Sequence, residues 1–361
     1  MADAGRRGRA FAAAEAAGID ALLLTHPPDI RYLSGFTGSS AVLVLARRRS
    51  VLFTDGRYTT QARSECKGTR VVISKRPALL EACAHIEKIG VKRCGFDSDH
   101  TTVSALDRMR KAVSAPLRRS FFQPAPAIVA KLRESKDAGE IARMRSAAEL
   151  GCRIFDSLFD YIIPGATEAE VALAIESAAR RAGASAMSFE TIVAGGLRSA
   201  LPHGVATSAR LPRRGFVTLD FGVVLDGYCS DMTRTVHLGR PSPEERAVYD
   251  AVLGAQLAAV SRVAPGVSGA EVDQAARAPL QRAGFGRCFT HSTGHGAGLE
   301  IHEGPRLAAN VQEKLRPGMV ITVEPGVYLP GRFGVRIEDM VLVTEQASEL
   351  LTLSTKALIE L

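Results

Sequence analysis

The sequence predicts two consecutive domains, an α/β domain followed by an α+β domain. Over the first third of the 361 residues, short strand-like runs alternate with helical segments, a pattern typical of one sheet covered by helices. The remainder starts with a long helical segment and then changes to β-prone runs and glycine-rich loops. A chain of this length also exceeds what one hydrophobic core usually organises. We therefore expect domains over residues 1–127 and 128–361.

The first domain is expected to contain short strands separated by helices. An alanine-rich N-terminal segment predicts a helix that ends at Gly18. The apolar runs that follow have strand length and are bounded by prolines, charges or glycines. The expected strands are residues 20–25, 41–46, 50–54, 71–74 and 93–96, and the expected helices are residues 78–89 and 102–113. Pro124 and Pro126 interrupt the pattern, so the domain boundary is placed near residue 127.

The second domain is expected to pack helices on a curved antiparallel sheet. Residues 128–159 carry apolar side chains at helical spacing, which predicts one long helix. Thr167 followed by Glu170 matches a capping box and begins another helix. Two more helices are expected over residues 242–263 and 268–283. The β-prone segments after Phe189 supply the strands.

The composition excludes several classes of protein. No apolar run approaches the roughly 20 residues that span a bilayer, so no membrane segment is expected. The net charge of +8 is spread in short arginine patches and tryptophan is absent, which argues against a nucleic-acid surface. Glu15 interrupts the N-terminal alanine-rich run, so it is not expected to be an export signal. Six scattered cysteines without a CxxC pair predict reduced thiols and a cytoplasmic protein.

Residues 215–236 predict a β-hairpin that carries two aspartates. Two β-prone runs flank Asp226-Gly227, a turn that needs positive φ at both positions. In that register Asp220 lies opposite Thr233, and Asp231 shares a face with Thr233. Two neighbouring carboxylates repel each other unless a cation lies between them. Either both aspartates bind a metal ion, or one faces solvent and the other pairs with Arg234.

Three later segments contain further candidate ligands. Residues 293–305 place His295 and His302 among glycines at every second position, which fits neither a dinucleotide fingerprint nor a zinc-protease helix. Glu324 ends an apolar strand directly before a proline. Arg336 and Glu338 share one face of a strand, where the guanidinium can orient the carboxylate. Taken one at a time, the glutamates could equally be ordinary charges at strand ends, and the histidine segment a flexible loop.

The combined set predicts a metal centre. The candidate ligands are Asp220, Asp231, His295, Glu324 and Glu338. One divalent ion cannot neutralise four carboxylates, whereas two divalent ions match their charge. Oxygen-rich ligation with a single nitrogen favours Mn²⁺, with Co²⁺ or Zn²⁺ as alternatives.

These motifs, in this order, resemble the pita-bread metallopeptidases, the family of methionine aminopeptidase, aminopeptidase P and prolidase. The matching segments are residues 220–222 and 231–234, residues 294–296 and 302–303, residues 324–326, and residues 336–339. Residues 29–38 and 52–58 are similar to the creatinase-type N-terminal domain, which methionine aminopeptidases generally lack. The resemblance covers essentially the whole chain, implies a pita-bread fold after that domain, and favours the proline-specific branch. Asp29 departs from the asparagine of many relatives, outside the ligand set.

The resemblance also implies how the metals are held. Asp220 and Asp231 are expected to bind one ion and His295 and Glu324 the other, with Asp231 and Glu338 bridging the two. Arg336 matches the arginine that, in the family, supports the bridging glutamate.

The remaining roles implied by the resemblance concern the substrate. Glu324 is expected to carry a proton from water to the leaving nitrogen, and His302 to stabilise the oxyanion. His203 and His291 match substrate-side histidines and are expected to shape a proline pocket.

The expected activity is an aminopeptidase that cleaves the first bond of peptides with proline at the second position, through a hydroxide that bridges two metal ions. A prolidase restricted to dipeptides is the alternative, and the protein is expected to be a homodimer. Two further readings, a metal-free creatinase-like hydrolase and a non-catalytic binding protein of the same fold, are disfavoured because such relatives lose the ligands that this chain retains.

Overall fold

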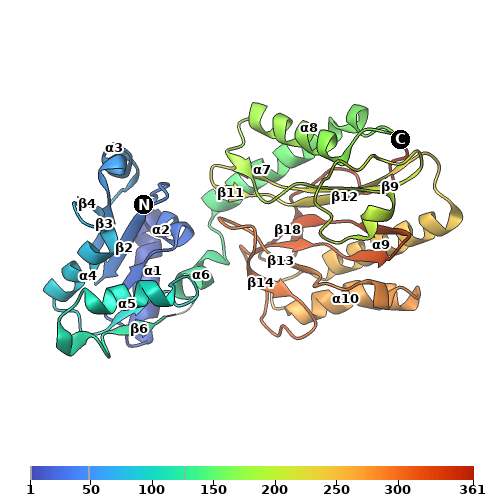
Figure 1. Ribbon diagram of the computed structural model, residues 1–361. Coiled ribbons are helices and arrows are strands. Elements are labelled where there is room, and N and C mark those ends of the chain that lie inside the picture. Colours follow the sequence, from blue (N-terminus) through green and yellow to red (C-terminus); the bar gives the residue numbers. More distant parts are fainter. Residues whose placement is uncertain (1, 48, 126) are drawn as a thin grey trace. The chain divides into compact units, whose positions relative to one another are not determined.

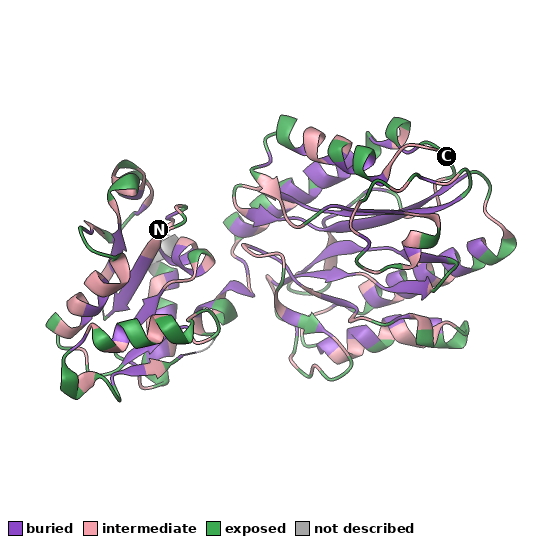
Figure 2. Cartoon of the chain, in the orientation of Figure 1, coloured by how far each residue is buried: buried purple, intermediate pink, exposed green. Residues whose placement is uncertain are grey.

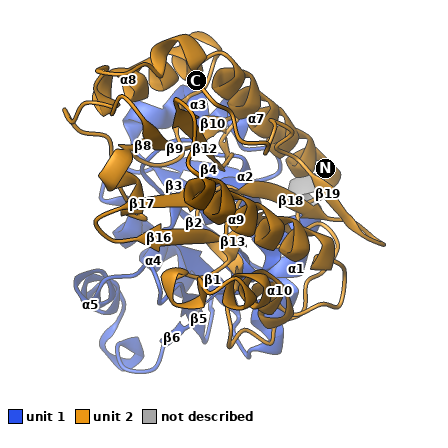
Figure 3. Cartoon of the chain, turned by 90° about the vertical axis from the view of Figure 1, so that its right-hand side faces the viewer, with its two compact units in different colours: residues 1–133 blue, residues 134–361 orange. Residues whose placement is uncertain are grey.

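The structure of the protein, a computed structural model, describes residues 2–47, 49–125 and 127–361, with side chains from residue 5 onward. It divides into two compact units, residues 1–133 and 134–361, which are coloured separately in Figure 3. The division lies a few residues beyond the expected boundary at residue 127, because helix α6 (Ile128–Arg133) packs against α1 (Ala2–Ala16). Pro126, invoked for that boundary, lies outside the described residues.

The first unit is a six-stranded mixed sheet with helices, as expected (Figure 1). Its strand order is β4-β3-β2-β1-β5-β6. The strands are β1 (Ala21–Leu24), β2 (Ala41–Ala46), β3 (Arg49–Thr54), β4 (Arg70–Ile73), β5 (Cys94–Phe96) and β6 (Phe122–Pro124). The helices besides α1 and α6 are α2 (Pro27–Ser34), α3 (Thr59–Glu65), α4 (Ala78–Lys88) and α5 (Val103–Lys111). Strand β1 runs parallel to β5, and β5 runs parallel to β6, so these three strands end at the same edge.

The second unit contains antiparallel strands and four long helices (Figure 1). The helices are α7 (Ala138–Asp156), α8 (Glu168–Arg181), α9 (Pro243–Arg262) and α10 (Gly269–Arg282). The strands are β7 (Ala186–Met187), β8 (Ile192–Gly195), β9 (Gly215–Phe221), β10 (Val223–Leu225), β11 (Tyr228–Cys229), β12 (Met232–Leu238), β13 (Gly294–Gly296), β14 (Glu303–Leu307), β15 (Val320–Val323), β16 (Gly326–Leu329), β17 (Phe333–Arg336), β18 (Asp339–Val343) and β19 (Ser348–Leu350).

Two large apolar cores and a smaller one between α7 and strands β15 and β18 lie among the described residues of this unit. Helices α7 and α8 pack on the sheet β12-β9-β8, and α9 and α10 pack on strands β14 to β18. The central strands are buried along their length whereas the outer faces of the helices are exposed, as Figure 2 shows. None of the described helices is long and apolar enough to cross a membrane.

The single helix expected over residues 128–159 is wrong, because the structure contains two helices, α6 and α7. Between them Ser135 forms a β-bridge with Met319, and the Lys136 N–H donates to the Gly318 carbonyl at 2.8 Å. Asp137 then caps α7 through the Glu140 N–H. Pairing with a strand far along the chain thus interrupts the helix while its apolar spacing continues.

The predicted helix starts and the predicted hairpin are confirmed. Thr167 caps α8 in a capping box with Glu170, and residues 242 and 268 cap α9 and α10 in the same way. The turn residues Asp226 and Gly227 have φ of 49° and 80°. Asp220 pairs with Thr233, as the two-residue turn requires.

A tight crossing at Gly222 divides the hairpin into two strand pairs without changing its register. A Cβ atom at Gly222 would lie 1.8 Å from the Ser230 carbonyl oxygen. Backbone atoms cannot move aside as a flexible side chain can, so only glycine fits here. This crossing lies between Asp220 and Asp231 and therefore fixes where their carboxylates point.

Gly222→Ala is expected to lower the free energy of unfolding by about 3 kcal/mol, because the added methyl group overlaps backbone. The control is Gly254→Ala in the middle of α9, where a Cβ meets nothing within 4 Å. That variant should be about 1 kcal/mol more stable, since alanine favours a helix. Urea unfolding measures both; equal stability of the two variants would contradict this account of the crossing.

Candidate metal centre

The ends of several strands bring the predicted ligands into one region of the second unit. Asp220 lies in β9 and Asp231 directly before β12. His295 is the central residue of β13, Glu324 follows β15, and Glu338 lies between β17 and β18. The His295 Nε2 atom is 3.6 Å from both Asp231 Oδ2 and Glu324 Oε1. One ligand atom each from Asp231, His295 and Glu338 lies within 4.8 Å of the others.

Glycines allow the strand that carries His295 to lie between two close neighbours. A Cβ atom at Gly294 would lie 1.9 Å from the Thr322 carbonyl oxygen, and one at Gly296 would lie 2.1 Å from the Gly304 carbonyl oxygen. The flexible-loop alternative is therefore wrong for His295, which lies in β13, whereas His302 lies in the loop between β13 and β14. His295 is held in place, because its N–H donates to Thr322 Oγ1 at 3.1 Å and its Nδ1 lies 3.1 Å from the Gly296 carbonyl oxygen.

The carboxylates of this region repel one another in a buried environment. Burial raises the pKa of Asp231 and of Glu338 well above the usual range, and the neighbouring carboxylates raise both further. Burial, with a contribution from Asp220, also raises the pKa of Glu324 to about 8. Within the described part of the chain, Asp220 Oδ1 and Asp231 Oδ1 are buried without a hydrogen-bond partner. Buried acceptors without donors are costly, so these carboxylates require a compensating cation.

One guanidinium supplies part of the missing charge. Arg336 donates to Asp220 Oδ2 at 2.5 Å and to Thr233 Oγ1 at 3.1 Å. The Thr233 hydroxyl in turn donates to Glu338 Oε2 at 2.7 Å. Arg336 was expected to support Glu338; its direct partner is Asp220, and it reaches Glu338 through Thr233. One cation against four carboxylates still leaves an excess of negative charge.

Tyr328 connects Arg336 to His291. The Arg336 guanidinium donates to Tyr328 Oη at 2.7 Å, and Oη lies 2.9 Å from His291 Nε2. His291 Nδ1 lies 2.8 Å from the Ser292 carbonyl oxygen, which can only accept. Nδ1 therefore carries the hydrogen and Nε2 accepts the tyrosine O–H. Burial lowers the pKa of His291 to about 4, consistent with this neutral tautomer.

The other two predicted histidines lie at the exposed side of the region. The rings of His302 and His295 meet edge to face, 4.5 Å between centroids. Burial lowers the pKa of His302, and the charges of His203 and Arg306 lower it further. His203 lies in the loop after residues 196–200 and is exposed. It also lowers the pKa of His291, so the three histidines lie within electrostatic reach of one another.

The alternative in which Arg234 neutralises one hairpin aspartate is wrong. Arg234 donates to Asp339 Oδ1 at 2.8 Å, and Lys356 Nζ lies 2.6 Å from Asp339 Oδ2. Asp220 and Asp231 are both buried, with neither facing solvent. Arg234 therefore neutralises neither Asp220 nor Asp231, and both can bind another cation.

Three functional partners were not recognised in the sequence. Thr233 and Tyr328 link Arg336 to the ligands, and Asp273 accepts from the Thr293 hydroxyl at 2.8 Å and from Arg277 at 2.7 Å. Thr293 in turn holds Glu324, whose N–H donates to its carbonyl oxygen at 2.8 Å. Of these three residues, only Thr233 could have been found from the sequence, because the predicted hairpin register places it opposite Asp220.

The donor set fits divalent metal ions. Such ions bind carboxylates and neutral imidazoles, and this region holds four carboxylates and one imidazole kept neutral by burial. Two of the carboxylates, Asp220 and Asp231, have a buried oxygen without a hydrogen-bond partner among the described residues. Burial lowers the pKa of His295 to about 4, so its ring nitrogen is available to a metal at neutral pH.

Comparison with known proteins identifies the class. The family described as metallopeptidase family M24 matches residues 142–345, and the creatinase/prolidase N-terminal domain matches residues 6–135. The chain belongs to metallopeptidase family M24, a metal-dependent family of peptidases. The pita-bread fold and the creatinase-type N-terminal domain expected from the sequence are thereby confirmed.

Three relatives illustrate the similarity. The Xaa-Pro dipeptidase of Pyrococcus horikoshii is 34% identical over 94% of this chain and 95% of its own length. The solved structure of an Xaa-Pro dipeptidase from Bacillus anthracis has a TM-score of 0.96 at 40% identity, covering 99% of this chain and all of that one. The X-Pro aminopeptidase structure from Thermotoga maritima has a TM-score of 0.89 at 35% identity, covering 97% of this chain and all of that one.

In metal-free protein, the free energy of unfolding is expected to fall as the pH rises from about 5 to about 8. The ordinary pKa of Glu324 is 4.5, whereas in the folded site it is about 8. The folded state therefore binds more protons between these values, so this contribution is fully present below 4.5 and is lost as the pH rises through 8.

Urea unfolding in the presence of a chelator measures this pH dependence. Glu324→Gln cannot ionise and should flatten the slope, and added Mn²⁺ should remove most of it in the unaltered protein. A metal-free slope of opposite sign, or one unaffected by Glu324→Gln, would contradict the electrostatic account.

Proposed function

We propose that this peptidase is an Xaa-Pro dipeptidase that holds two divalent ions, preferably Mn²⁺, between Asp220, Asp231, His295, Glu324 and Glu338. The observation that carries the proposal is the buried carboxylate group, in which Asp220 Oδ1 and Asp231 Oδ1 have no hydrogen-bond partner within the described residues. Two divalent ions match the charge of four carboxylates, and a single ion does not. Asp231 and Glu338 are the proposed bridging ligands.

Bound divalent ions would lower the pKa of a water molecule and polarise the scissile carbonyl. The chain then has to move protons and orient the substrate. Glu324 Oε1 is the proposed proton carrier, taking a proton from the attacking water and delivering it to the leaving nitrogen. Asp273 and Thr293 fix the backbone from which Glu324 extends.

Donors on the exposed side would stabilise the transition state. His302 is the proposed donor to the oxyanion that develops on the carbonyl oxygen, because it projects beside His295. Arg336 is a positioning residue, since its guanidinium is committed to Asp220, Thr233 and Tyr328.

Cleavage before proline sets a further requirement. The leaving nitrogen of an Xaa-Pro bond carries no hydrogen, so the pocket has to accept a ring without requiring an N–H donor. His291 already uses Nε2 to accept the Tyr328 hydroxyl and therefore presents no free acceptor there. His203 and His291 are the proposed residues that shape this pocket.

Substrate length separates the two candidate activities. The sequence favoured an aminopeptidase. That activity is the second candidate, because the Thermotoga maritima relative is named an X-Pro aminopeptidase. Two of the three relatives described above are named Xaa-Pro dipeptidases, which favours the first. Arg306 in β14 is exposed and lowers the pKa of both His295 and His302, so it lies beside the site. A guanidinium there can pair with the terminal carboxylate that only a dipeptide places so close to the scissile bond.

We further propose a cytoplasmic homodimer. The six cysteines, all in the described part of the chain, form no disulfide, which supports a reducing compartment. The dimer rests on the family resemblance alone.

The test is a length series with the Mn²⁺-loaded protein: Xaa-Pro, its C-terminal amide, Xaa-Pro-Yaa and longer peptides. A dipeptidase should hydrolyse Xaa-Pro with a kcat/KM at least about tenfold above that for the amide, since a charge pair contributes about 1.4 kcal/mol or more. Arg306→Gln should remove this preference, whereas Glu324→Gln should fold normally and lose turnover for every substrate.

Equal kcat/KM along the series would establish the aminopeptidase instead. No hydrolysis with Mn²⁺, Co²⁺ or Zn²⁺ would overturn both candidates.

A further inference from the structure

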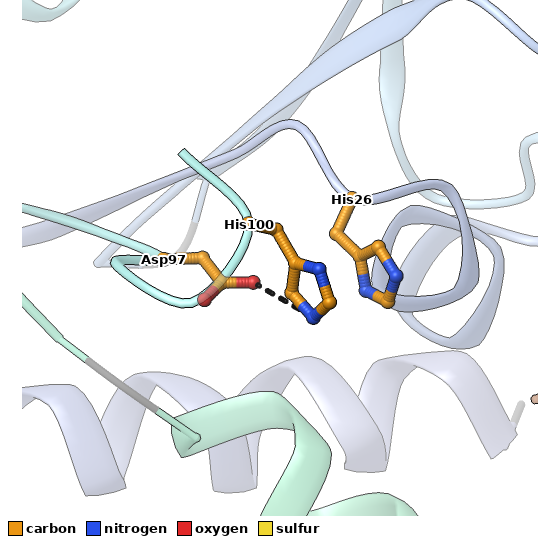
Figure 4. Close-up of side chains that lie close together, drawn as sticks. All are labelled: His26, Asp97 and His100. Atoms are coloured by element: carbon orange, nitrogen blue, oxygen red, sulfur yellow. Dashed lines mark ion pairs between the residues drawn. The ribbon is translucent and has the colours of Figure 1, made fainter. Parts of the chain in front are cut away.

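A second group of possible metal ligands lies in the first unit, at one edge of its sheet. Strands β1 and β5 run parallel, with Leu23 paired to Phe96. His26 follows the end of β1, and Asp97 and His100 follow the end of β5. Loops at the carboxyl ends of adjacent parallel strands are where open α/β sheets bind ligands. The fold itself therefore brings these three side chains together (Figure 4).

The distances suit one ion. The rings of His26 and His100 are stacked, with centroids 3.6 Å apart and planes inclined by 4°. Asp97 Oδ2 lies 4.0 Å from His100 Nε2, and one ligand atom from each residue lies within 4.8 Å of the others. Two ligands on one tetrahedral zinc ion are about 3.3 Å apart, given bonds of about 2.0–2.2 Å. The lone pair of an imidazole nitrogen lies in the ring plane, so the two rings have to rotate out of their parallel stack for both to bind one ion.

A second carboxylate and its arginine partner lie beside His26. Asp29 Oδ2 lies 3.5 Å from His26 Nδ1, and Asp29 Oδ1 accepts from Arg133 at 2.7 Å. The His26 ring is 10% exposed and the Asp97 side chain 9%, so both are largely desolvated.

The cavity beside these residues has room for an ion, and one of the residues is exposed to solvent. A cavity of about 20 Å³ opens beside Asp29, Asp97 and His100. That volume is enough for one water molecule or one ion. The exposed His100 gives the ion a route from solvent.

We propose that His26, Asp97 and His100 form a separate site for a Zn²⁺-type ion in the first unit, with a fourth position open to solvent. Two imidazoles and one carboxylate suit Zn²⁺, in contrast to the oxygen-rich centre of the second unit. The ion would tie the start of α2 to the loop before α5 and so stabilise the first unit. This inference does not depend on the proposed peptidase specificity.

Zinc binding to the full-length protein tests the proposal, by elemental analysis after dialysis against buffered micromolar Zn²⁺. His100→Gln and His26→Asn should each bind one Zn²⁺ fewer per chain than the unaltered protein. The control is Asp107→Asn in α5, which removes a carboxylate outside the ligand group and outside the cavity and should bind the full number. Equal zinc content in all four proteins would overturn the proposal.

His26→Asn also controls for folding. His26 is the N-cap of α2 and makes no capping hydrogen bond with its side chain, whereas asparagine is a favoured N-cap. The metal-free variant should therefore unfold at the same or a higher temperature than the unaltered protein. Added Zn²⁺ should raise the unfolding temperature of Asp107→Asn more than that of His26→Asn, and an equal rise would contradict the site.

Hydrolysis separates this inference from the proposed function. Neither His26 nor His100 belongs to the catalytic region, so both variants should keep Xaa-Pro hydrolysis when loaded with Mn²⁺. Suppose that both variants bind one Zn²⁺ fewer than the unaltered protein, and that none of the proteins hydrolyses Xaa-Pro. That result would refute the proposed activity and leave the zinc site supported.

Discussion

The mutual repulsion of buried carboxylates is the constraint on which the second unit depends. Asp231, Glu324 and Glu338 all have raised pKa values because burial and neighbouring charge disfavour their ionised forms. Arg336 offsets part of this charge by pairing with Asp220, and Thr233 relays its influence to Glu338. A bound cation would offset this repulsion. In the proposed account, affinity for metal and lower stability without metal are therefore two consequences of one charge distribution.

The rest of the fold holds these groups in place. The glycine crossing at residue 222 and the close strands around His295 fix backbone positions that side-chain packing alone would leave adjustable. Tyr328 couples Arg336 to His291, which connects the proposed metal ligands to the proposed proline pocket. A change at Tyr328 should therefore affect both charge balance and substrate orientation, although Tyr328 is not among the proposed metal ligands.

The hairpin that carries Asp220 and Asp231, two of the proposed ligands, could be predicted from the sequence because local rules determine it. The Asp226-Gly227 turn sets the register, and the two-residue period of a strand then places Asp220 opposite Thr233. The network of Tyr328 and Asp273 could not be predicted, because it joins segments that meet only after the strands pack. The break between α6 and α7 was missed for the same reason: Ser135 pairs with Met319, a contact that helical periodicity cannot reveal. Arg336 was expected to support Glu338, but strand alternation did not identify Asp220 as its direct partner.

The central claim, that the carboxylate group holds a pair of divalent ions, is tested most directly by counting bound Mn²⁺ in active protein. The count should be made in the His26→Asn background, so that the site proposed in the first unit does not contribute. The account predicts two Mn²⁺ per chain, a clear reduction in Glu338→Ala, and activity that rises in parallel with occupancy. Full activity without bound metal, or an unchanged count in Glu338→Ala, would contradict it.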